Sequence, residues 1–341
     1  MPKVTVFIPV YNRARYVRTA VDSILAQSFT DFELLLVDDG STDDSVAILR
    51  SYTDCRIRIE ENGQNLGVPR TRNRGLELAR GEYLALLDSD DYSYPTRLAK
   101  QVDFLDRHPD YAEIGAWNRA MDESGKPLAK VKFQPVGAEE TRATMLFRCA
   151  IKNRSVMGRT ALLRQLGYRE SFPRCQDYDL HVRLAEQHHI GNLPEVLVLG
   201  RLHEERWTRQ TEDLGNRAKM QIMADQLSQL GLEPSEDELR RHLLLAHKTA
   251  ASDALQHDQA YLGWAGDWLE RLRQRNRITR RYAEPAFDRV IGEIWLGVCL
   301  RGAGKLGARA LFSYARSSLP KGLRPLLERR LYRFGLSPAR L

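Results

Sequence analysis

The chain has 341 residues, of which 43% are hydrophobic and 28% are charged, so it can bury a sizeable core and is not disordered throughout. No run approaches the ~18 consecutive apolar residues that span a bilayer. The first residues lead directly into a strand-like segment, so we expect no secretory signal peptide. The four cysteines are scattered without a C-x-x-C pair, which argues against a zinc site or a disulfide framework and suits the cytoplasm.

The net charge of +7 is distributed unevenly along the chain. Residues 271–341 contain 17 Lys and Arg against 4 Asp and Glu, a net charge of +13, whereas the remainder carries −6. The acidic and the basic part of the molecule are therefore expected to face different partners.

The first hundred residues alternate between strand and helix signals. Short apolar runs at Val4–Pro9, Phe32–Val37 and Tyr83–Leu87 are typical of strands that are buried on both faces of a sheet. Between them, apolar residues at helical spacing predict helices over 17–25 and 98–105. This alternation predicts an α/β fold with a mixed, mostly parallel sheet flanked by helices.

After residue 105 the pattern loosens. A turn at Glu123–Pro127 separates two expected strands, helices follow from about Gly137 and over 177–188, and a last strand is expected at Glu195–Leu199. From about Asn216 onward all signals are helical. We therefore expect a catalytic domain over residues 1–210 and a helical, strongly basic region over residues 211–341.

Three acidic groups follow an apolar run or open a helix: Asp38-Asp39, Asp88-Ser89-Asp90-Asp91 and Gln176-Asp177-Tyr178-Asp179. Ligands of open α/β sheets bind beyond the carboxyl ends of the strands, where the first two groups are expected. Carboxylates in such positions are also common as turn and helix-capping residues. That alternative suits Asp43, which we expect near the start of a helix.

Capping does not explain the run from Asp88 to Asp91 well. Three carboxylates within four residues repel one another and require a cation. In an extended segment Asp88 and Asp90 face the same side. Mg²⁺ and Mn²⁺ bind one or two carboxylates together with substrate phosphates. This run therefore predicts a metal site that binds a nucleoside diphosphate.

A set of motifs appears in a fixed order along the first part of the chain. The set comprises Val6-Phe7-Ile8-Pro9-Val10-Tyr11-Asn12, Leu36-Val37-Asp38-Asp39-Gly40-Ser41-Thr42-Asp43, Asn65-Leu66-Gly67, Arg72-Asn73 and Gly81-Glu82-Tyr83-Leu84-Ala85-Leu86-Leu87-Asp88-Ser89-Asp90-Asp91. This set resembles family 2 glycosyltransferases, and Gln176-Asp177-Tyr178-Asp179-Leu180 and Arg201-Leu202-His203 extend the resemblance to about residue 208. The resemblance implies an inverting, metal-dependent enzyme with the A-type glycosyltransferase fold.

The resemblance also implies roles for individual residues. The donor nucleotide sugar would be bound by Pro9, Tyr11, Asp39, Arg72 and Asp88, with Asp39 accepting from the base and Asp88 contacting the ribose. The cation, Mn²⁺ or Mg²⁺, would be held by Asp90 and His203. Asp177 would be the general base, because an inverting transfer needs a proton acceptor and not a nucleophile.

Two departures from the family pattern affect these assignments. Gln176 stands where the family often has an acidic residue before the base, so Asp179 stays an alternative and Asp177 could simply cap its helix. The residues after His203 are also unlike the family pattern, and a lone histidine is commonly structural.

The basic C-terminal region contains a second pattern. One apolar stripe with adjacent arginines is formed by Leu323, Leu326, Leu327, Leu331 and Phe334. The pattern fits the surface of an anionic membrane or, equally, a helix that packs on its own domain. Nucleic acid is not an expected partner, since no binding motif and no aromatic stacking platform is present.

The expected function is transfer of a UDP- or GDP-linked sugar to an acceptor hydroxyl. The acceptor would be a glycan or lipid-linked glycan in cell-envelope polysaccharide or glycoconjugate synthesis, in the cytoplasm or on the inner face of the cell membrane. Two alternatives stay open: a catalytically inactive nucleotide-sugar-binding or scaffolding protein, and a nucleotidyltransferase. The second would need a Gly-rich, lysine-bearing phosphate loop, which Pro9-Val10-Tyr11-Asn12 is not.

Overall fold

The computed structural model describes residues 1–202, 212–247 and 258–322. It divides into two compact units. The sheet unit comprises residues 1–137 and 151–212, and the helical unit comprises residues 138–150 and 213–341. The segment 138–150, which lies inside the expected catalytic domain, thus groups with the C-terminal helices.

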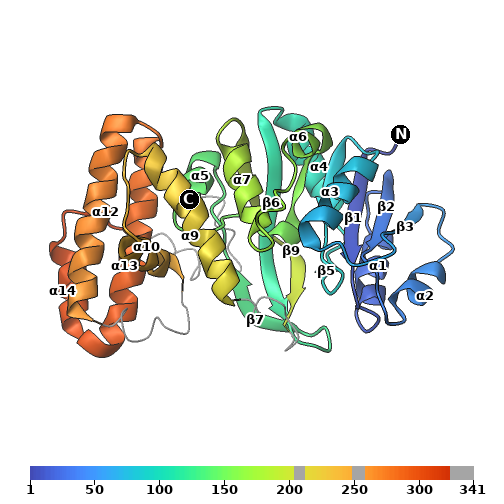
Figure 1. The fold of residues 1–341 in the computed structure, drawn as a ribbon, viewed down its shortest axis with the longest axis horizontal. Helices are drawn as coiled ribbons and strands as arrows, with labels where there is room; N and C mark the ends of the chain where they lie inside the picture. The colour runs from blue at the N-terminus through green and yellow to red at the C-terminus, as the bar shows by residue number, and fades with distance from the viewer. Residues whose placement is uncertain (203–211, 248–257, 323–341) are drawn as a thin grey trace. The chain divides into compact units, whose positions relative to one another are not determined.

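The described part of the sheet unit contains a nine-stranded mixed sheet with the order β3-β2-β1-β4-β8-β6-β9-β5, and β7 pairs with β6 (Figure 1). The strands are β1 (Val4–Val10), β2 (Phe32–Asp38), β3 (Ile57–Glu61), β4 (Tyr83–Leu86), β5 (Tyr92–Ser93), β6 (Tyr111–Met121), β7 (Pro127–Lys132), β8 (Met157–Arg159) and β9 (His189–Arg201). The first four strands run parallel, β9 runs parallel to β6, and β8, β7 and β5 run antiparallel to their neighbours. The expected mixed α/β fold is confirmed.

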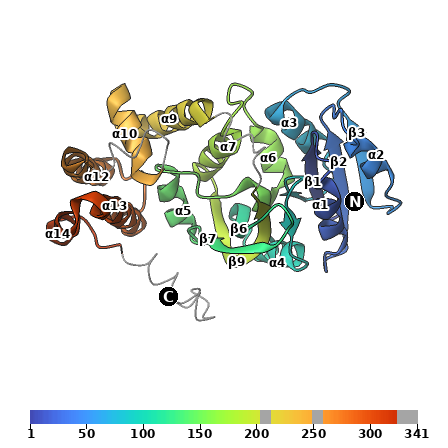
Figure 2. The same cartoon turned by 90° about the horizontal axis from the view of Figure 1, so that it is seen from below.

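Helices cover both faces of this sheet. They are α1 (Val17–Leu25), α2 (Ser45–Arg50), α3 (Val68–Leu78), α4 (Arg97–Arg107), α6 (Thr160–Leu166) and α7 (Gln176–Ala185), with a 3₁₀ turn η1 (Asn153–Ser155) before β8. Contacts join α1 with α2, α3 with α6, and α6 with α7. Figure 2 shows α3, α6 and α7 on one side of the sheet and α4 on the other.

The apolar runs form the centre of this sheet for the expected reason. β2 is buried along its whole length, and β1 is buried except at Pro9. Both strands have neighbours on each side and helices above and below, so nearly every side chain leaves water. The stripe on α1 packs against them through Val17, Val21 and Ile24, which are fully buried. The three strands predicted from apolar runs are therefore confirmed.

The strand order creates a switch point between β1 and β4. The chain proceeds outward from β1 to β2 and β3, and then returns to the other side of β1 as β4. The connections on the two sides of β1 therefore leave in opposite directions and open a crevice at the carboxyl ends of these strands. The residues directly after β1, β2 and β4 are the ones that the sequence motifs single out.

The helical unit consists of α5 (Ala138–Met145), α9 (Glu212–Gln229), α10 (Glu236–Ala246), α12 (Gln259–Thr279), α13 (Glu284–Leu306) and α14 (Ala308–Arg316). α10 begins with a capping box, in which Ser235 accepts from the amide of Glu238 and the Glu238 carboxylate accepts from the amide of Ser235. Trp268 and Trp295 are buried in the core of this unit. Among the described helices, none combines the length and apolar character needed to cross a membrane.

Candidate active site

Asp39 follows β2 and organises the start of α3. Its Oδ1 accepts hydrogen bonds from Asn62 Nδ2 at 2.7 Å and from the amide of Leu66 at 2.9 Å, and its Oδ2 accepts from the amide of Gly67 at 3.1 Å. Three donors thus satisfy this carboxyl group, and the residue is only 5% exposed. Asp39 therefore holds the turn that directs α3 towards the carboxyl edge of the sheet.

Gly40 allows two loops of this edge to approach each other. Its φ is +76°, and a Cβ at this position would lie 2.5 Å from the backbone of Gln64. A side chain is therefore excluded both by the left-handed backbone and by the neighbouring loop. The preceding Asp38 is buried and accepts from the amides of Gly40 and Ser41. Asp38 is thus a structural turn residue.

The loop after β1 presents Tyr11 at the surface. The next residue, Asn12, has a φ of 50°, and its side chain accepts from the amide of Thr42 at 2.8 Å. Its own amide donates to Ser41 Oγ at 2.9 Å. These bonds tie the loops after β1 and β2 together. Tyr11 is 42% exposed and Pro9 is half-buried, so an apolar and aromatic surface borders the crevice.

Arg72 connects the carboxylates of this region. It lies on α3, is 8% exposed, and its Nη2 is 3.6 Å from Asp88 Oδ1. Its guanidinium lies 5.5 Å from the ring centroid of Tyr168, a cation–π contact that orients it. The same guanidinium is the strongest of the neighbouring charges that lower the pKa of Asp177. Arg72 therefore pairs with Asp88, at the end of β4, and its charge also acts on Asp177, on α7.

Asp88, Asp90 and Asp91 form one acidic group, as predicted. Each offers a carboxylate oxygen, and these oxygens all lie within 4.8 Å of one another. Asp88 and Asp90 are partly exposed, whereas Asp91 is fully buried. Only Asp88 and Asp90 are thus accessible to a ligand from the crevice.

Asp91 is held by Arg154, to which the sequence motifs give no role, and by Arg201 of the motif Arg201-Leu202-His203. The carboxylate of Asp91 accepts from Arg154 Nη1 at 2.7 Å and from the amide of Arg201 at 2.9 Å. Arg201 Nε also donates to the backbone oxygen of Asp90 at 2.9 Å. Burial raises the pKa of Asp91, and the charge of Arg154 acts in the opposite direction. Part of the positive charge that the acidic run requires is therefore supplied by the protein.

Gly200 leaves space for the side chain of Arg154. A Cβ at Gly200, in β9, would lie 2.3 Å from Arg154 Nη1. The Gly200-Arg201 pair at the end of the last strand was the available sequence signal, because glycine inside a strand often marks a close approach. Arg154 lies in the short η1 turn and has no comparable signal in the sequence.

The acidic group fits a divalent cation. Its donors are carboxylate oxygens, the ligands that Mg²⁺ and Mn²⁺ prefer. Asp91 is held by Arg154 and Arg201, which leaves Asp88 and Asp90 as the two partly exposed carboxylates of the group. Such a site would use one or two carboxylates and complete its coordination with phosphate oxygens and water. His203, the other expected metal ligand, lies outside the described residues.

Asp177 and Asp179 of α7 have different surroundings. Asp179 is 5% exposed and forms ion pairs with Arg169 at 3.3 Å and with Arg183 at 2.8 Å. The helix is capped at Cys175, so Asp177 is not the N-cap residue. Burial raises the pKa of Asp177, but Arg72 and then His181 oppose this, and the net result is a lowered pKa. The charge of Arg72, which pairs with Asp88, therefore also favours the ionised form of Asp177.

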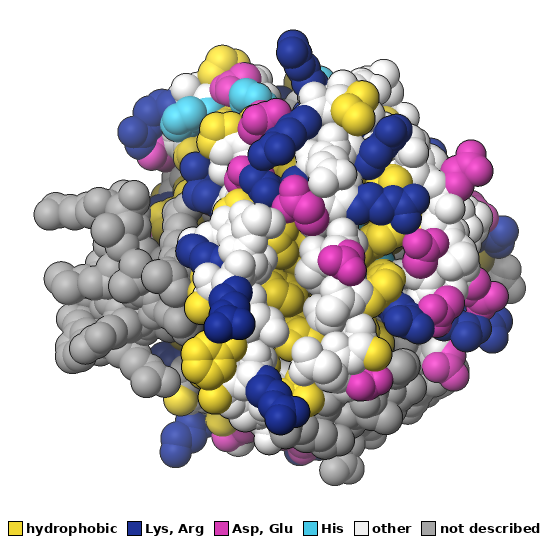
Figure 3. Space-filling view, turned by 90° about the vertical axis from the view of Figure 1, so that its left-hand side faces the viewer, with side chains coloured by type: hydrophobic (Ala, Val, Ile, Leu, Met, Phe, Trp, Pro, Cys, Tyr) yellow, Lys and Arg dark blue, Asp and Glu magenta, His cyan; other side chains and the backbone are white. Residues whose placement is uncertain are grey.

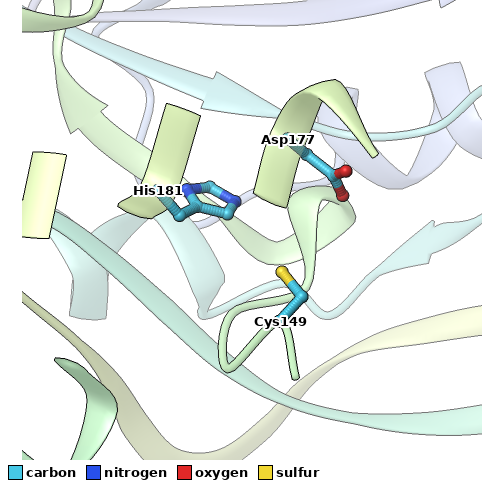
Figure 4. A group of neighbouring side chains, drawn as sticks. All are labelled: Cys149, Asp177 and His181. Carbon is cyan, nitrogen blue, oxygen red and sulfur yellow. The ribbon is translucent and has the colours of Figure 1, made fainter. Parts of the chain in front are cut away.

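His181 and Glu113 were also not predicted. His181 lies one helical turn after Asp177, and its Nδ1 is 2.8 Å from Oε1 of Glu113 in β6. Figure 4 shows His181 and Asp177 on α7. The available signal for Glu113 was a single acidic residue inside the apolar run Tyr111–Trp117, which indicates a buried partner.

Comparisons with known sequences agree with the motifs. The family model for glycosyl transferase family 2 matches residues 5–165. EpsE of Bacillus subtilis, named as a glycosyltransferase, is 34% identical over 203 residues, which covers 58% of this chain and 72% of EpsE. Chondroitin synthase of Escherichia coli is 29% identical over 234 residues, which covers 68% of this chain and 34% of that protein.

Solved structures share the fold over most of the chain. Residues 1–349 of Staphylococcus aureus TarS in complex with UDP-GlcNAc align with a TM-score of 0.58 at 18% identity, covering 92% of each chain. The mannosyltransferase PcManGT from Pyrobaculum calidifontis, in complex with GDP-Man and Mn²⁺, aligns with a TM-score of 0.51 at 17% identity, covering 99% of this chain and 82% of its own.

Proposed function

This chain belongs to glycosyl transferase family 2, and we propose that it transfers a sugar from a UDP- or GDP-linked donor to an acceptor hydroxyl with inversion at the anomeric carbon. The observation that carries the proposal is the meeting of three groups in the sheet unit. Arg72 lies 3.6 Å from Asp88 and is the main charge that acts on Asp177. The proposed phosphate-binding cation, metal-binding run and partly buried base therefore belong to one electrostatic group near the switch point.

The donor would occupy the crevice at the carboxyl ends of β1, β2 and β4. Tyr11 and Pro9 offer an apolar border for the nucleoside, and Asp39 lies at the turn before α3. Arg72 would donate to the diphosphate, because a guanidinium binds phosphate oxygens through several N–H groups. Asp88, which is partly exposed, would contact the ribose.

A cation would be held by Asp90, with His203 as a second ligand. When bound, Mn²⁺ or Mg²⁺ would supply positive charge to the leaving diphosphate. PcManGT, which shares the fold, was solved with GDP-Man and Mn²⁺. In this chain the oxygen donors of the acidic group suit either ion.

Asp177 would act as the general base. The acceptor oxygen forms a bond to the anomeric carbon while the bond from this carbon to the diphosphate oxygen breaks, and the acceptor proton passes to the Asp177 carboxylate. A positioned base of this kind typically accelerates transfer by ~10²–10⁴-fold. The lowered pKa of Asp177 supports this role, since a base must be ionised before it accepts a proton.

The biological context that we propose is synthesis of cell-envelope polysaccharide or glycoconjugate, with a glycan or lipid-linked glycan as the acceptor. EpsE and chondroitin synthase, which match this chain, support a polysaccharide role. The enzyme would work in the cytoplasm, at the inner face of the membrane.

The helical unit supports an anionic membrane as a partner. Leu311 and Phe312 of α14 are 47% and 62% exposed, and the neighbouring Arg309 and Arg316 are exposed as well. Figure 3 shows Lys and Arg side chains that border hydrophobic side chains on a face of this unit. The apolar stripe expected over residues 323–334 lies outside the described residues.

A thermal-shift screen of nucleotide sugars tests the donor assignment. UDP- and GDP-linked sugars are compared with and without Mn²⁺, since a ligand at ~100 times its Kd stabilises the folded state by about 2.7 kcal/mol. The proposal predicts a rise in Tm for one nucleotide class, larger with Mn²⁺, followed by release of that nucleoside diphosphate. No shift with any nucleotide sugar would contradict it.

A further inference from the structure

A buried ion pair lies beside the proposed base. Nδ1 of His181, on α7, is 2.8 Å from Oε1 of Glu113, on β6. The two side chains are 1% and 0% exposed. Within the described part of the chain, neither oxygen of Glu113 accepts a hydrogen bond, so the ion pair with His181 is the contact that faces this carboxylate. A fully buried carboxylate needs a cation, and the His181 ring in contact with it supplies one when protonated.

The other side of the same imidazole faces Asp177. The two residues are four positions apart on α7 and therefore lie on the same face of the helix. A ring nitrogen of His181 and a carboxylate oxygen of Asp177 lie within 4.8 Å of each other. Figure 4 shows the imidazole and the carboxylate in this arrangement. His181 is thus flanked by the carboxylates of Glu113 and Asp177.

The charges around this group favour an imidazolium. Burial lowers the pKa of His181, but Glu113 and then Asp177 oppose it, and the net result is a raised pKa. Arg72 acts against protonation of His181. The other titratable groups that influence Asp177 or Glu113 are Lys152, Arg154, Tyr168 and Arg174.

We propose that Glu113 and His181 are positioning residues that act through Asp177: the Glu113 carboxylate holds His181 as an imidazolium, and this charge keeps the partly buried Asp177 carboxylate ionised and oriented. The inference rests on Asp177 being the base of the proposed transfer. Without the imidazolium, burial would favour the protonated form of Asp177, which accepts no proton. The Glu113–His181 pair thereby keeps the enzyme active at a lower pH than it would be without the pair.

The protonation state of His181 is tested first, because it requires no substrate. Histidine labelled with ¹³C and ¹⁵N is incorporated, and the His181 signal among the eight histidines is identified by its loss in His181→Phe. We expect this ring to titrate above the ordinary value of ~6.5, and to titrate lower in Glu113→Gln. Titration at or below ~6.5 in the unmodified protein would overturn the proposal.

The pH profile of the reaction tests the effect on the base. Release of nucleoside diphosphate is measured against pH for the unmodified enzyme, Glu113→Gln and the double variant Glu113→Leu/His181→Phe. The double variant is included in case Glu113→Gln does not fold, because apolar replacement of both members of a buried ion pair is often tolerated. We expect the acid limb of kcat/KM to move to higher pH by about one unit in both variants, because each loses the imidazolium charge near Asp177. The donor KM should stay within a few-fold.

A second histidine–carboxylate pair provides the matched control. His189 Nδ1 lies 2.7 Å from Asp110 Oδ2 in the same unit, and both side chains are about half exposed. His189→Gln should leave the pH profile unchanged. An unchanged acid limb in folded, active Glu113→Gln and in the double variant would show that the buried pair is only structural. Absence of nucleotide release from the unmodified enzyme, or full activity of Asp177→Asn, would instead refute the proposed function.

Discussion

The two units each bury a histidine completely, and the two histidines have opposite charge preferences. In the sheet unit, His181 lies against Glu113 and near Asp177, and these carboxylates raise its pKa. In the helical unit, burial lowers the pKa of His242 to about 4. Trp268 Nε1 donates to His242 Nδ1 at 2.9 Å, so Nε2 must carry the proton that it shares with the carbonyl of Leu146, also at 2.9 Å. His242 is thus a neutral ring with one fixed tautomer.

The difference between the two histidines reflects the kind of side chain that each unit buries. The sheet unit buries charges in opposed groups around one crevice, where Arg154, Arg72 and His181 face carboxylates. The helical unit buries aromatic and aliphatic side chains, and its buried polar groups are neutral partners such as the His242–Trp268 pair. Buried charge is costly unless it is paired. We therefore expect mutations in the first unit to affect chemistry and mutations in the second to affect stability.

The largest effect is expected for Asp90→Ala. This change should abolish transfer and metal-dependent donor binding, because it removes the carboxylate proposed to join the cation to the diphosphate. The free energy of unfolding should change little, since Asp90 is partly exposed in a loop after β4. Activity assays and donor titrations across a range of Mn²⁺ concentrations measure both effects. A variant whose activity kept the Mn²⁺ dependence of the parent would refute the metal assignment.

Asp177→Asn is expected to have the next largest effect. Turnover should fall by about 10²-fold or more while donor affinity stays within a few-fold, because only the proton acceptor is lost. Steady-state kinetics with donor binding measured separately distinguish the two parameters.

The matched variant is Asp179→Asn on the same helix. Asp179 is paired with Arg169 and Arg183, so its loss should lower stability more than turnover. If Asp179→Asn instead caused the larger loss of turnover with intact donor binding, the base would have to be reassigned.

A substitution of His242 tests the expectation for the helical unit. Its folded pKa of about 4 lies below the usual value of 6.5, so the unfolded chain binds the proton more readily. Stability is therefore complete above the unfolded pKa and falls as the pH drops towards 4, by about 2 kcal/mol between about pH 7 and about pH 5. Denaturant unfolding of the parent and of His242→Phe at both pH values isolates this contribution.

His242→Phe should lose that part of the pH dependence and keep the kcat of the parent. It should also be less stable at neutral pH, because the partners of His242 at Trp268 and Leu146 lose their hydrogen bonds. An equal pH dependence in both proteins would mean that His242 is not held neutral. A large loss of kcat would contradict the expectation that mutations in the helical unit affect stability and not chemistry.

The smallest effect on the chemistry is expected from removal of residues 320–341. The shortened protein should no longer sediment with anionic vesicles at low salt, because each basic residue near such a surface contributes about 1 kcal/mol. Donor binding should be unchanged. Added salt should weaken vesicle binding of the complete chain. If the complete chain stays in the supernatant at low salt, the membrane is not a partner and the stripe is a packing surface.

Much of the sheet could be predicted because its signals are local. An apolar run such as Phe32–Val37 has few alternatives to a buried strand, and the prediction is confirmed by β2. The acidic run from Asp88 to Asp91 was visible for the same reason, since its members are neighbours in the chain and in space. Residues that act in pairs from distant segments were missed. Arg154 reaches Asp91 across 63 positions, and no local pattern records that contact.

The sequence by itself determined the alternation of strands and helices, the family motifs and the accumulation of carboxylates after strands, because each depends on residues within a few positions of one another. Only the tertiary structure decided which carboxylates are paired with arginines inside the protein and which stay available to a ligand. Asp91 and Asp179 are each held by arginines, while Asp177 faces Arg72 and His181. The physical reason is that charge state depends on burial and on the nearest charges, and both are set by segments that meet only after folding.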